Sequence, residues 1–432
     1  MTQKNLNTNE LLPAVRATLS SETLISCTLI PTGNLSGGIE KALPKLENLH
    51  ELQGDTVEEV IQELKERTSM QQNSSVQQRP PQKNATEQSQ PLAQQNASGQ
   101  QSASGQQGTM ILPAYLHIHG TGIICCAATR HESGLLHANA LKIANNQEPE
   151  KVTGPPATGR VKNRIAIVTG AAQGFGKGIA EELFQEGANI VIADLNEEAG
   201  KALEIELNKN KTANRALFLQ ANVSESASVQ NMIEQTVTAF GGLDVLISNA
   251  GILRAGGLDE MEPDTFELMT KVNYIGYFLC AKYATEVMKV QTAHNKDLYS
   301  DIIQINSKSG LKGSKKNFAY AGGKFGGIGL TQSFALELMP DRIKVNSVCP
   351  GNFFDGPLWS DPKTGLFVQY LEAGKVPGAK TVDDVKHFYE AQVPAGRGCE
   401  VKDVSRAILY AIEQEYETGQ AIPVTGGQEM LK

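Results

Sequence analysis

The sequence predicts an α/β fold in which helices cover both faces of a doubly wound parallel sheet. From about residue 161 onward, short apolar runs alternate with stretches in which apolar residues recur at helical spacing. The first apolar run leads into a glycine-rich turn and then directly into a helical stretch. Strands that alternate with helices pair in parallel and are buried on both faces, which explains why these runs are apolar throughout.

The chain has 432 residues, and its composition divides it into four parts. Residues 1–68 form a small N-terminal region with a helical signal, because the capping box Thr56–Glu59 precedes an apolar stripe. Residues 69–109 are rich in Gln, Ser and Asn, which predicts a disordered linker. We interpret residues 110–160 as an irregular segment of unknown role and residues 161–432 as the α/β domain. Since such a linker transmits few contacts, we expect residues 1–109 to be dispensable for that domain.

The charge and composition exclude several classes of function. The net charge of −8 and the pI of about 5.5 argue against a nucleic-acid partner, which would favour a basic surface. No apolar run approaches the ~20 residues of a membrane helix, and the N-terminus lacks a signal-peptide pattern. The six cysteines are scattered, as in a reduced protein. We therefore expect a cytoplasmic protein without a membrane partner.

The pair His117 and His119, with the later His131 and His137, suggests a zinc site. Two histidines without further ligands at a suitable spacing are weak evidence for zinc. We expect no metal site.

The glycine-rich turn predicts a dinucleotide site. It follows the apolar run at residues 165–168 and opens into the helical stretch that begins near Lys177. Glycines let the backbone approach a pyrophosphate, and the helix N-terminus offers free N–H groups and a positive dipole end. This context indicates a Rossmann-like fold. The candidate residues of the turn are Gly170, Gln173, Gly174, Phe175 and Gly176.

Asp194 predicts which dinucleotide binds. It ends the second apolar run, roughly 20 residues beyond the glycine turn, where an acidic side chain can accept hydrogen bonds from the ribose hydroxyls. The same carboxylate would repel the 2′-phosphate of NADP. An ordinary loop-capping role for Asp194 is the alternative interpretation. We predict NAD as the cofactor.

Tyr320, Lys324 and Ser307 form the candidate catalytic group. A tyrosine and a lysine at i and i+4 share one face of a helix, so the ammonium should lower the pKa of the phenol. Such a phenol can exchange a proton with a carbonyl or alcohol. Ser307 ends the apolar run at residues 302–306, at the carboxyl end of a predicted strand, where open α/β sheets bind ligands.

These motifs together resemble the short-chain dehydrogenase/reductase family from about residue 161 to the C-terminus. The resemblance implies that Tyr320 is the general base in alcohol oxidation and the acid in carbonyl reduction. It also implies that Lys324 lowers the tyrosine pKa and holds the nicotinamide ribose, that Ser307 orients the substrate oxygen, and that Asn273 holds a water connecting Lys324 to solvent.

The same resemblance implies further cofactor contacts and an assembly. Asn222 and Val223 would lie beside the adenine, although the family commonly has Asp-Val there. Other family members often have a threonine where this chain has Asn352, so Asn352 would have to replace its contact with the nicotinamide carboxamide. The family also implies a homodimer or homotetramer. The remaining implied cofactor residues are Asn249, Ala250, Gly251, Tyr320, Lys324, Pro350 and Gly351.

The substrate candidates are basic residues around the catalytic group. Lys308, Lys312, Lys315 and Lys316 lie between Ser307 and Tyr320 and could create a local phosphate-binding field, although a solvated loop is the plainer interpretation. Arg397 is a further candidate, because arginine can hold phosphate through two hydrogen bonds.

Several stretches resemble the polyol-phosphate dehydrogenases of the family, namely residues 302–310, 324–338, 397–399 and 425–428. The segment 353–392 is rich in aromatic residues, glycine and proline and predicts a lid over the substrate. The leading hypothesis is an NAD-dependent oxidoreductase that interconverts sorbitol 6-phosphate and fructose 6-phosphate. One alternative is a dehydrogenase of an unphosphorylated polyol or another secondary alcohol. An alternative of another class is a nucleotide-sensing or assembly module.

Overall fold

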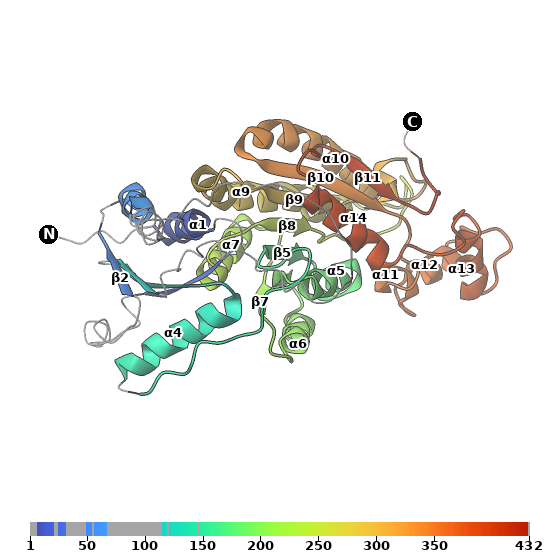
Figure 1. The fold of residues 1–432 in the computed structure, drawn as a ribbon. Coiled ribbons are helices and arrows are strands. Elements are labelled where there is room, and N and C mark those ends of the chain that lie inside the picture. Colours follow the sequence, from blue (N-terminus) through green and yellow to red (C-terminus); the bar gives the residue numbers. More distant parts are fainter. Residues whose placement is uncertain are drawn as a thin grey trace, which may run out of the picture.

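The computed structural model describes residues 7–20, 25–31, 49–53, 56–66, 115–118, 121–145 and 147–430. Within these residues the larger sheet has seven strands, all parallel, in the order β11-β10-β9-β8-β5-β6-β7 (Figure 1). The predicted Rossmann-like fold is therefore confirmed. The strands are β5 (Ile165–Thr169), β6 (Asn189–Asp194), β7 (Ala216–Gln220), β8 (Val245–Ser248), β9 (Ser300–Ile305), β10 (Ile343–Pro350) and β11 (Ala421–Val424).

Helices cover both faces of this sheet, as a doubly wound fold requires. One apolar core joins the sheet to α5 (Gly174–Gln185), α6 (Glu197–Leu207) and α14 (Val401–Glu413). Another core joins the opposite face to α7 (Ser226–Phe240), α9 (Gly276–His294) and α10 (Phe318–Leu338). Every residue of β5, β9 and β10 is buried, because the helices exclude water from both faces.

The N-terminal part of the chain folds into a second, smaller unit. Among the described residues it has a four-stranded sheet in the order β1-β4-β3-β2. The strands β1 and β2 precede residues 69–109 in the chain, and β3 and β4 follow them. The elements are α1 (Thr8–Leu19), β1 (Ser26–Pro31), β2 (Leu49–Leu52), a helix over 57–66, β3 (Tyr115–Ile118), β4 (Gly122–Ala127) and α4 (Arg130–Ala144). Thr56 and Glu59 exchange the predicted capping-box hydrogen bonds.

The interpretation of residues 110–160 as irregular is wrong, because this segment contains β3, β4 and α4. The strands β3 and β4 form a hairpin, but their outer partners β2 and β1 precede the Gln-rich segment. Local sequence does not reveal such long-range pairing. The predicted linker, residues 69–109, lies outside the described residues.

The smaller unit is joined to the α/β domain by buried contacts, so the expectation of few contacts is also wrong. Arg16 of α1 donates hydrogen bonds of 2.8 Å to both carboxylate oxygens of Asp244, just before β8, and neither side chain is exposed. Asn295, after α9, donates to the backbone oxygen of Ser20. The apolar core on the α7/α9 face continues into α1, through residues such as Leu11.

The segment after β10, for which the sequence predicts a substrate lid, folds into three short helices, and the name lid is kept for it. It contains α11 (Pro357–Ser360), α12 (Leu366–Glu372) and α13 (Val382–Glu390), which share an aromatic core around Trp359. Figure 1 shows the lid helices at one end of the molecule and the N-terminal unit at the other. The lid follows the carboxyl end of β10, whereas Arg16 reaches the amino end of β8. The lid and the N-terminal unit therefore lie at opposite ends of the parallel strands.

Candidate active site

Ser307, Tyr320 and Lys324 come together at the carboxyl edge of the sheet. Ser307 follows β9 and caps the short 3-10 turn Lys308–Gly310, accepting a hydrogen bond from the N–H of Ser309. Tyr320 lies in the first turn of α10, where the Ser307 side chain acts to lower the pKa of the phenol. One turn later, Lys324 Nζ lies 5.6 Å from the Tyr320 ring centroid and donates to the Ile305 carbonyl oxygen at 2.7 Å. The predicted spacing thus produces a compact group.

Asn273 lies in a π-helical turn, Lys271–Ile275, between α8 (Pro263–Thr270) and α9. Its side-chain amide pairs with both the N–H and the carbonyl of Ile252, each at 2.8 Å. The adjacent Gly251 is close to both Asn273 and Lys324, since a Cβ there would lie 3.1 Å from Asn273 Oδ1 and 3.9 Å from Lys324 Nζ. The wider π turn, which is common at functional sites, turns Asn273 toward the catalytic group.

The expected lowering of the Tyr320 pKa is not met in this arrangement. Burial raises the pKa of Tyr320 to about 12, and the Ser307 side chain offsets only part of that effect. The lid is the physical reason, because Tyr320 packs against its aromatic core. Burial also lowers the pKa of Lys324 to about 8. Desolvation therefore outweighs the attraction expected from the Tyr–Lys spacing.

The glycine turn has the geometry of a phosphate-binding loop. Gly170 and Gly174 have φ values of +63° and +60°, which favour glycine. A Cβ on Gly176 would lie 2.1 Å from the Gly170 carbonyl oxygen, so only glycine fits. Helix α5 begins at Gly174, and within the described residues Gln173 gives no side-chain cap to its first N–H groups. Phe175 stacks on Phe353 of the lid, with ring centroids 4.5 Å apart.

Asp194 lies beside this turn at the end of β6. Its carboxylate oxygens accept hydrogen bonds of 2.9 Å from the N–H groups of Ala172 and Asn196. The loop-capping role is therefore real. It is compatible with ribose binding, because an ionised carboxylate has about four lone-pair sites.

Two of the predicted asparagines are engaged within the protein. Asn249 donates to the carbonyl oxygens of Thr169 and Gly170 at 2.9 and 3.1 Å, which ties β8 to the end of β5. Asn222 accepts from Ser224 and donates to Glu225. Val223 is buried in the apolar core. The contacts of these residues and of Ala250 with the cofactor stay predictions.

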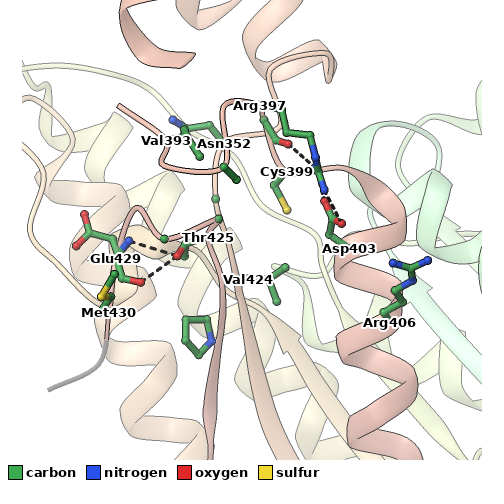
Figure 2. Close-up of a pocket in the computed structure, with 16 residues that line it drawn as sticks. Asn352, Val393, Arg397, Cys399, Asp403, Arg406, Val424, Thr425, Glu429 and Met430 are labelled. Carbon is green, nitrogen blue, oxygen red and sulfur yellow. Dashed lines mark hydrogen bonds and ion pairs between the residues drawn. The ribbon is translucent and has the colours of Figure 1, made fainter. Parts of the chain in front are cut away.

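Asn352, after Pro350 and Gly351, has an unsatisfied donor. Its Nδ2 is buried and has no hydrogen-bond partner among the described residues. The backbone around it is held by a hydrogen bond from Gly351 to Val424 and one from Cys399 to Asn352. A cavity of about 580 Å³ adjoins these residues (Figure 2). A carboxamide oxygen is the kind of acceptor that this donor lacks, so the predicted nicotinamide contact fits the site.

The predicted substrate residues do not all lie next to the candidate catalytic group. Arg397 is exposed in this cavity and is held by Asp403 through hydrogen bonds of 2.6 and 3.0 Å, as Figure 2 shows. Lys312 pairs with Glu429 at 3.4 Å. Lys308 differs, because it is partly buried directly beside Ser307 and burial lowers its pKa. Of the three, only Lys308 borders the catalytic group.

Sequence reasoning missed three residues beside the site. Tyr370 of the lid accepts a hydrogen bond of 3.1 Å from Asn317, the N-cap of α10, and contributes to the raised pKa of Tyr320. Lys375 lies over the Tyr370 ring, with Nζ 3.7 Å from the centroid. Only the aromatic richness of the lid hinted at these contacts, because they join segments far apart in the chain.

The parallel sheet, the glycine turn and the Ser–Tyr–Lys group define a nucleotide-dependent oxidoreductase. The family model for short chain dehydrogenases matches residues 164–359. The chain belongs to this family, whose members use NAD or NADP. Within the described residues, no helix is long and apolar enough to cross a membrane. The same part of the chain has no group of three His, Cys, Asp or Glu side chains placed to hold a metal.

The relatives of this chain include enzymes that are named for different substrates. The chain is 35% identical to sorbitol-6-phosphate 2-dehydrogenase of Escherichia coli K12 over 271 residues, which cover 62% of this chain and 100% of that one. It is 33% identical to trans-4-hydroxycyclohexanecarboxylate dehydrogenase of Sinomonas cyclohexanicum, covering 62% and 94%. The solved sorbitol-6-phosphate 2-dehydrogenase of Erwinia amylovora matches with a TM-score of 0.57 and 36% identity, covering 62% and 100%.

Proposed function

We propose that the protein is an NAD-dependent oxidoreductase that interconverts a sugar-alcohol phosphate and a ketose phosphate. Sorbitol 6-phosphate and fructose 6-phosphate are the leading pair. The observation that carries the proposal is the convergence of Ser307, Tyr320 and Lys324 in a chain that spans the full length of the E. coli enzyme. The candidate anion-binding lysine at position 308, directly beside Ser307, supports a charged substrate.

The proposed mechanism assigns a task to each side chain. Ser307 holds the oxygen of the reacting carbon, and Tyr320 takes the hydroxyl proton in oxidation or returns it in reduction. Lys324 stabilises the phenolate and holds the nicotinamide ribose, and Asn273 holds a water that links Lys324 to solvent. The cofactor, when bound, accepts or supplies the hydride.

The preference for NAD rests on Asp194 and Gln173. The Asp194 carboxylate lies next to the glycine turn, where it can accept from the ribose hydroxyls and repel a 2′-phosphate. Gln173 adds no positive charge that would attract that phosphate. Asp194→Ala should raise the KM for NAD and narrow the preference for NAD over NADP, measured as the ratio of kcat/KM values. A wild type that already prefers NADP would contradict this part of the proposal.

The deciding experiment is to follow NADH formation by the full chain with sorbitol 6-phosphate and with sorbitol. We expect a much higher kcat/KM for the phosphate ester. Equal values, or turnover of sorbitol alone, would contradict the proposed substrate and favour a neutral polyol.

A second candidate is a dehydrogenase of a cyclic secondary alcohol without phosphate. It is favoured by the relative from Sinomonas, which is nearly as similar as the E. coli enzyme. trans-4-Hydroxycyclohexanecarboxylate therefore belongs in the same assay. A nucleotide-sensing module is disfavoured by the intact catalytic group.

We also propose a cytoplasmic homodimer or homotetramer. Large apolar side chains are exposed on α8, α9, α10 and the π turn between α8 and α9, namely Phe266, Ile275, Phe278, Phe325 and Leu336. Such a surface is expected to be covered by a second copy. Light scattering on the purified chain tests this, since a monomeric mass at micromolar concentration would contradict the assembly.

A further inference from the structure

We propose that Lys375 of the lid, together with Lys308, forms the site that binds the anionic group of the substrate. The ligand class is a phosphate monoester. This inference rests on the proposed function and names the part of the lid that distinguishes a phosphorylated polyol from a neutral one.

The first observation is the position of Lys375 relative to the catalytic helix. Lys375 follows α12, and its N–H donates to the carbonyl of Tyr370. Its ammonium lies 3.7 Å from the centroid of the Tyr370 ring, and the Tyr370 hydroxyl accepts from Asn317. Asn317 occupies the N-cap position of the helix that carries Tyr320, without a side-chain capping hydrogen bond, and Tyr320 packs against the aromatic cluster that contains Tyr370. Lys375 thus contacts Tyr370, and Tyr370 belongs to the cluster against which Tyr320 packs.

The second observation is an unsatisfied polar atom at the same place. Asn317 is 6% exposed, and its Oδ1 is buried without a hydrogen-bond partner in the described part of the chain. An amide oxygen accepts hydrogen bonds, so it would bind a hydroxyl group of the polyol rather than the phosphate oxygens, which are acceptors themselves. The polar site around Asn317 therefore has unused capacity beside a cation.

The third observation is the charge around Lys375. Burial, followed by repulsion from Lys308 and Lys316, lowers the pKa of Lys375 to about 8. Lys308 directly follows the catalytic Ser307, and Lys316 lies in the loop that leads to α10. No ion pair involves Lys375 within the residues that the structure describes. Lys316 pairs with Glu260 at 2.9 Å and is therefore not counted as part of the anion site. Cations that repel one another without full neutralisation favour the binding of an anion.

The other basic candidates are less available. Arg397 is held by Asp403 through two hydrogen bonds, and Lys312 is paired with Glu429. An anion would have to displace a carboxylate from either of them. The plainer explanation for Lys375 is a cation–π contact with Tyr370 that serves only to pack the lid. If Lys375 binds an anion, its removal should weaken the binding of a phosphorylated substrate only. If it only packs the lid, its removal should affect charged and neutral substrates alike.

The test compares Lys375→Ala with Lys380→Ala, which removes an exposed lysine from the same lid. We expect Lys375→Ala to raise the KM for sorbitol 6-phosphate by about tenfold to a hundredfold, the range for a lost charged hydrogen bond. The kcat should change little, Lys375→Arg should recover much of the affinity, and Lys380→Ala should resemble the wild type. For a lysine that only packs the lid, kcat and the KM for a neutral polyol would change as well.

A second measurement does not depend on the substrate. Inorganic phosphate should raise the Tm of the wild type in the presence of saturating NADH, which fills the glycine turn. The rise should be smaller in Lys375→Ala than in Lys380→Ala. If sorbitol 6-phosphate is turned over and the two variants behave alike, the inference is wrong and the proposed function stands. If sorbitol 6-phosphate is not turned over, the proposed substrate is wrong. In that case an equal Tm rise in both variants overturns the anion site, and a selective loss in Lys375→Ala supports it.

Discussion

The pKa of Tyr320 is shifted in opposite directions by two features of its surroundings. Burial under the lid raises its pKa to about 12, while the Ser307 side chain lowers it. Near neutral pH the phenol is therefore protonated, which suits proton donation to a carbonyl. Alcohol oxidation requires the phenolate, which the charge of Lys324 must stabilise when the reacting groups are in place.

Tyr320→Phe removes the proton donor and keeps the ring that packs against the lid. We expect kcat to fall by about 10²–10⁴-fold, the usual contribution of general acid–base assistance, with NAD affinity retained. Steady-state kinetics and a cofactor titration measure the two effects. Turnover close to that of the wild type would remove Tyr320 from the catalytic group.

The lowered pKa of Lys324, about 8, predicts the pH dependence of oxidation. Below this pKa, kcat/KM should rise with pH because the phenolate fraction increases. Above it, Lys324 loses its charge and no longer stabilises the phenolate, so kcat/KM should stop rising near pH 8. Lys324→Arg keeps the charge at high pH and should remove that break. A break that persists in this variant would assign it to another group.

Three elements meet at the carboxyl ends of the strands and position the residues of the candidate site. The glycine turn places the N-terminus of α5 next to Asp194, and the π turn places Asn273 beside Gly251. The lid then closes the edge, with Phe353 stacked on Phe175. Each element contributes a short backbone feature, so small changes in the backbone should affect binding more than chemistry.

Gly176→Ala tests this idea at the glycine turn. The new Cβ would lie 2.1 Å from the Gly170 carbonyl oxygen, so the turn must shift. We expect a loss of about 1–3 kcal/mol in stability, as for overpacked sites, and a higher Kd for NAD. Gly257→Ala is the matched control, because its Cβ would meet only ordinary contacts at 3.6 Å. Equal NAD affinity in both variants would show that the turn does not hold the cofactor.

At the scale of the whole molecule, the N-terminal unit is part of the folded dehydrogenase. Arg16 and Asp244 are completely buried. Burial raises the pKa of Asp244, but the attraction of Arg16 outweighs it and the net pKa lies below the usual value. This contribution to stability is therefore present above the unfolded pKa of about 4 and is lost as the pH falls through the lower folded value.

Arg16→Ala should lower the free energy of unfolding by about 3–5 kcal/mol, because it leaves a buried carboxylate without its partner. Arg160→Ala is the control, since its ion pair with Glu413 is exposed and should contribute at most about 1 kcal/mol. Chemical denaturation measures both. Because Arg16 lies at the edge opposite the lid, kcat of the folded variant should be unchanged. Similar stabilities of the two variants would show that the N-terminal unit is only loosely attached.

The α/β domain and the candidate catalytic group could both be predicted from the sequence alone. The glycine turn, the strand-ending Ser307 and the pair Tyr320 and Lys324 are recognisable because each depends on a few neighbouring residues and on helical or strand spacing. The roles predicted for Arg397 and Lys312 depended on which carboxylates lie nearby, and only the fold revealed Asp403 and Glu429.

How the distant parts of the chain pair and pack against one another became visible only in the folded structure. It joined β1 and β2 to β3 and β4 across the Gln-rich segment, buried Arg16 against Asp244, and placed Lys375 over Tyr370 beside the catalytic helix. It also reversed the expected direction of the Tyr320 pKa. The physical reason is the same in each case, because pairing, burial and desolvation depend on residues that are distant in sequence and leave no local periodicity to read.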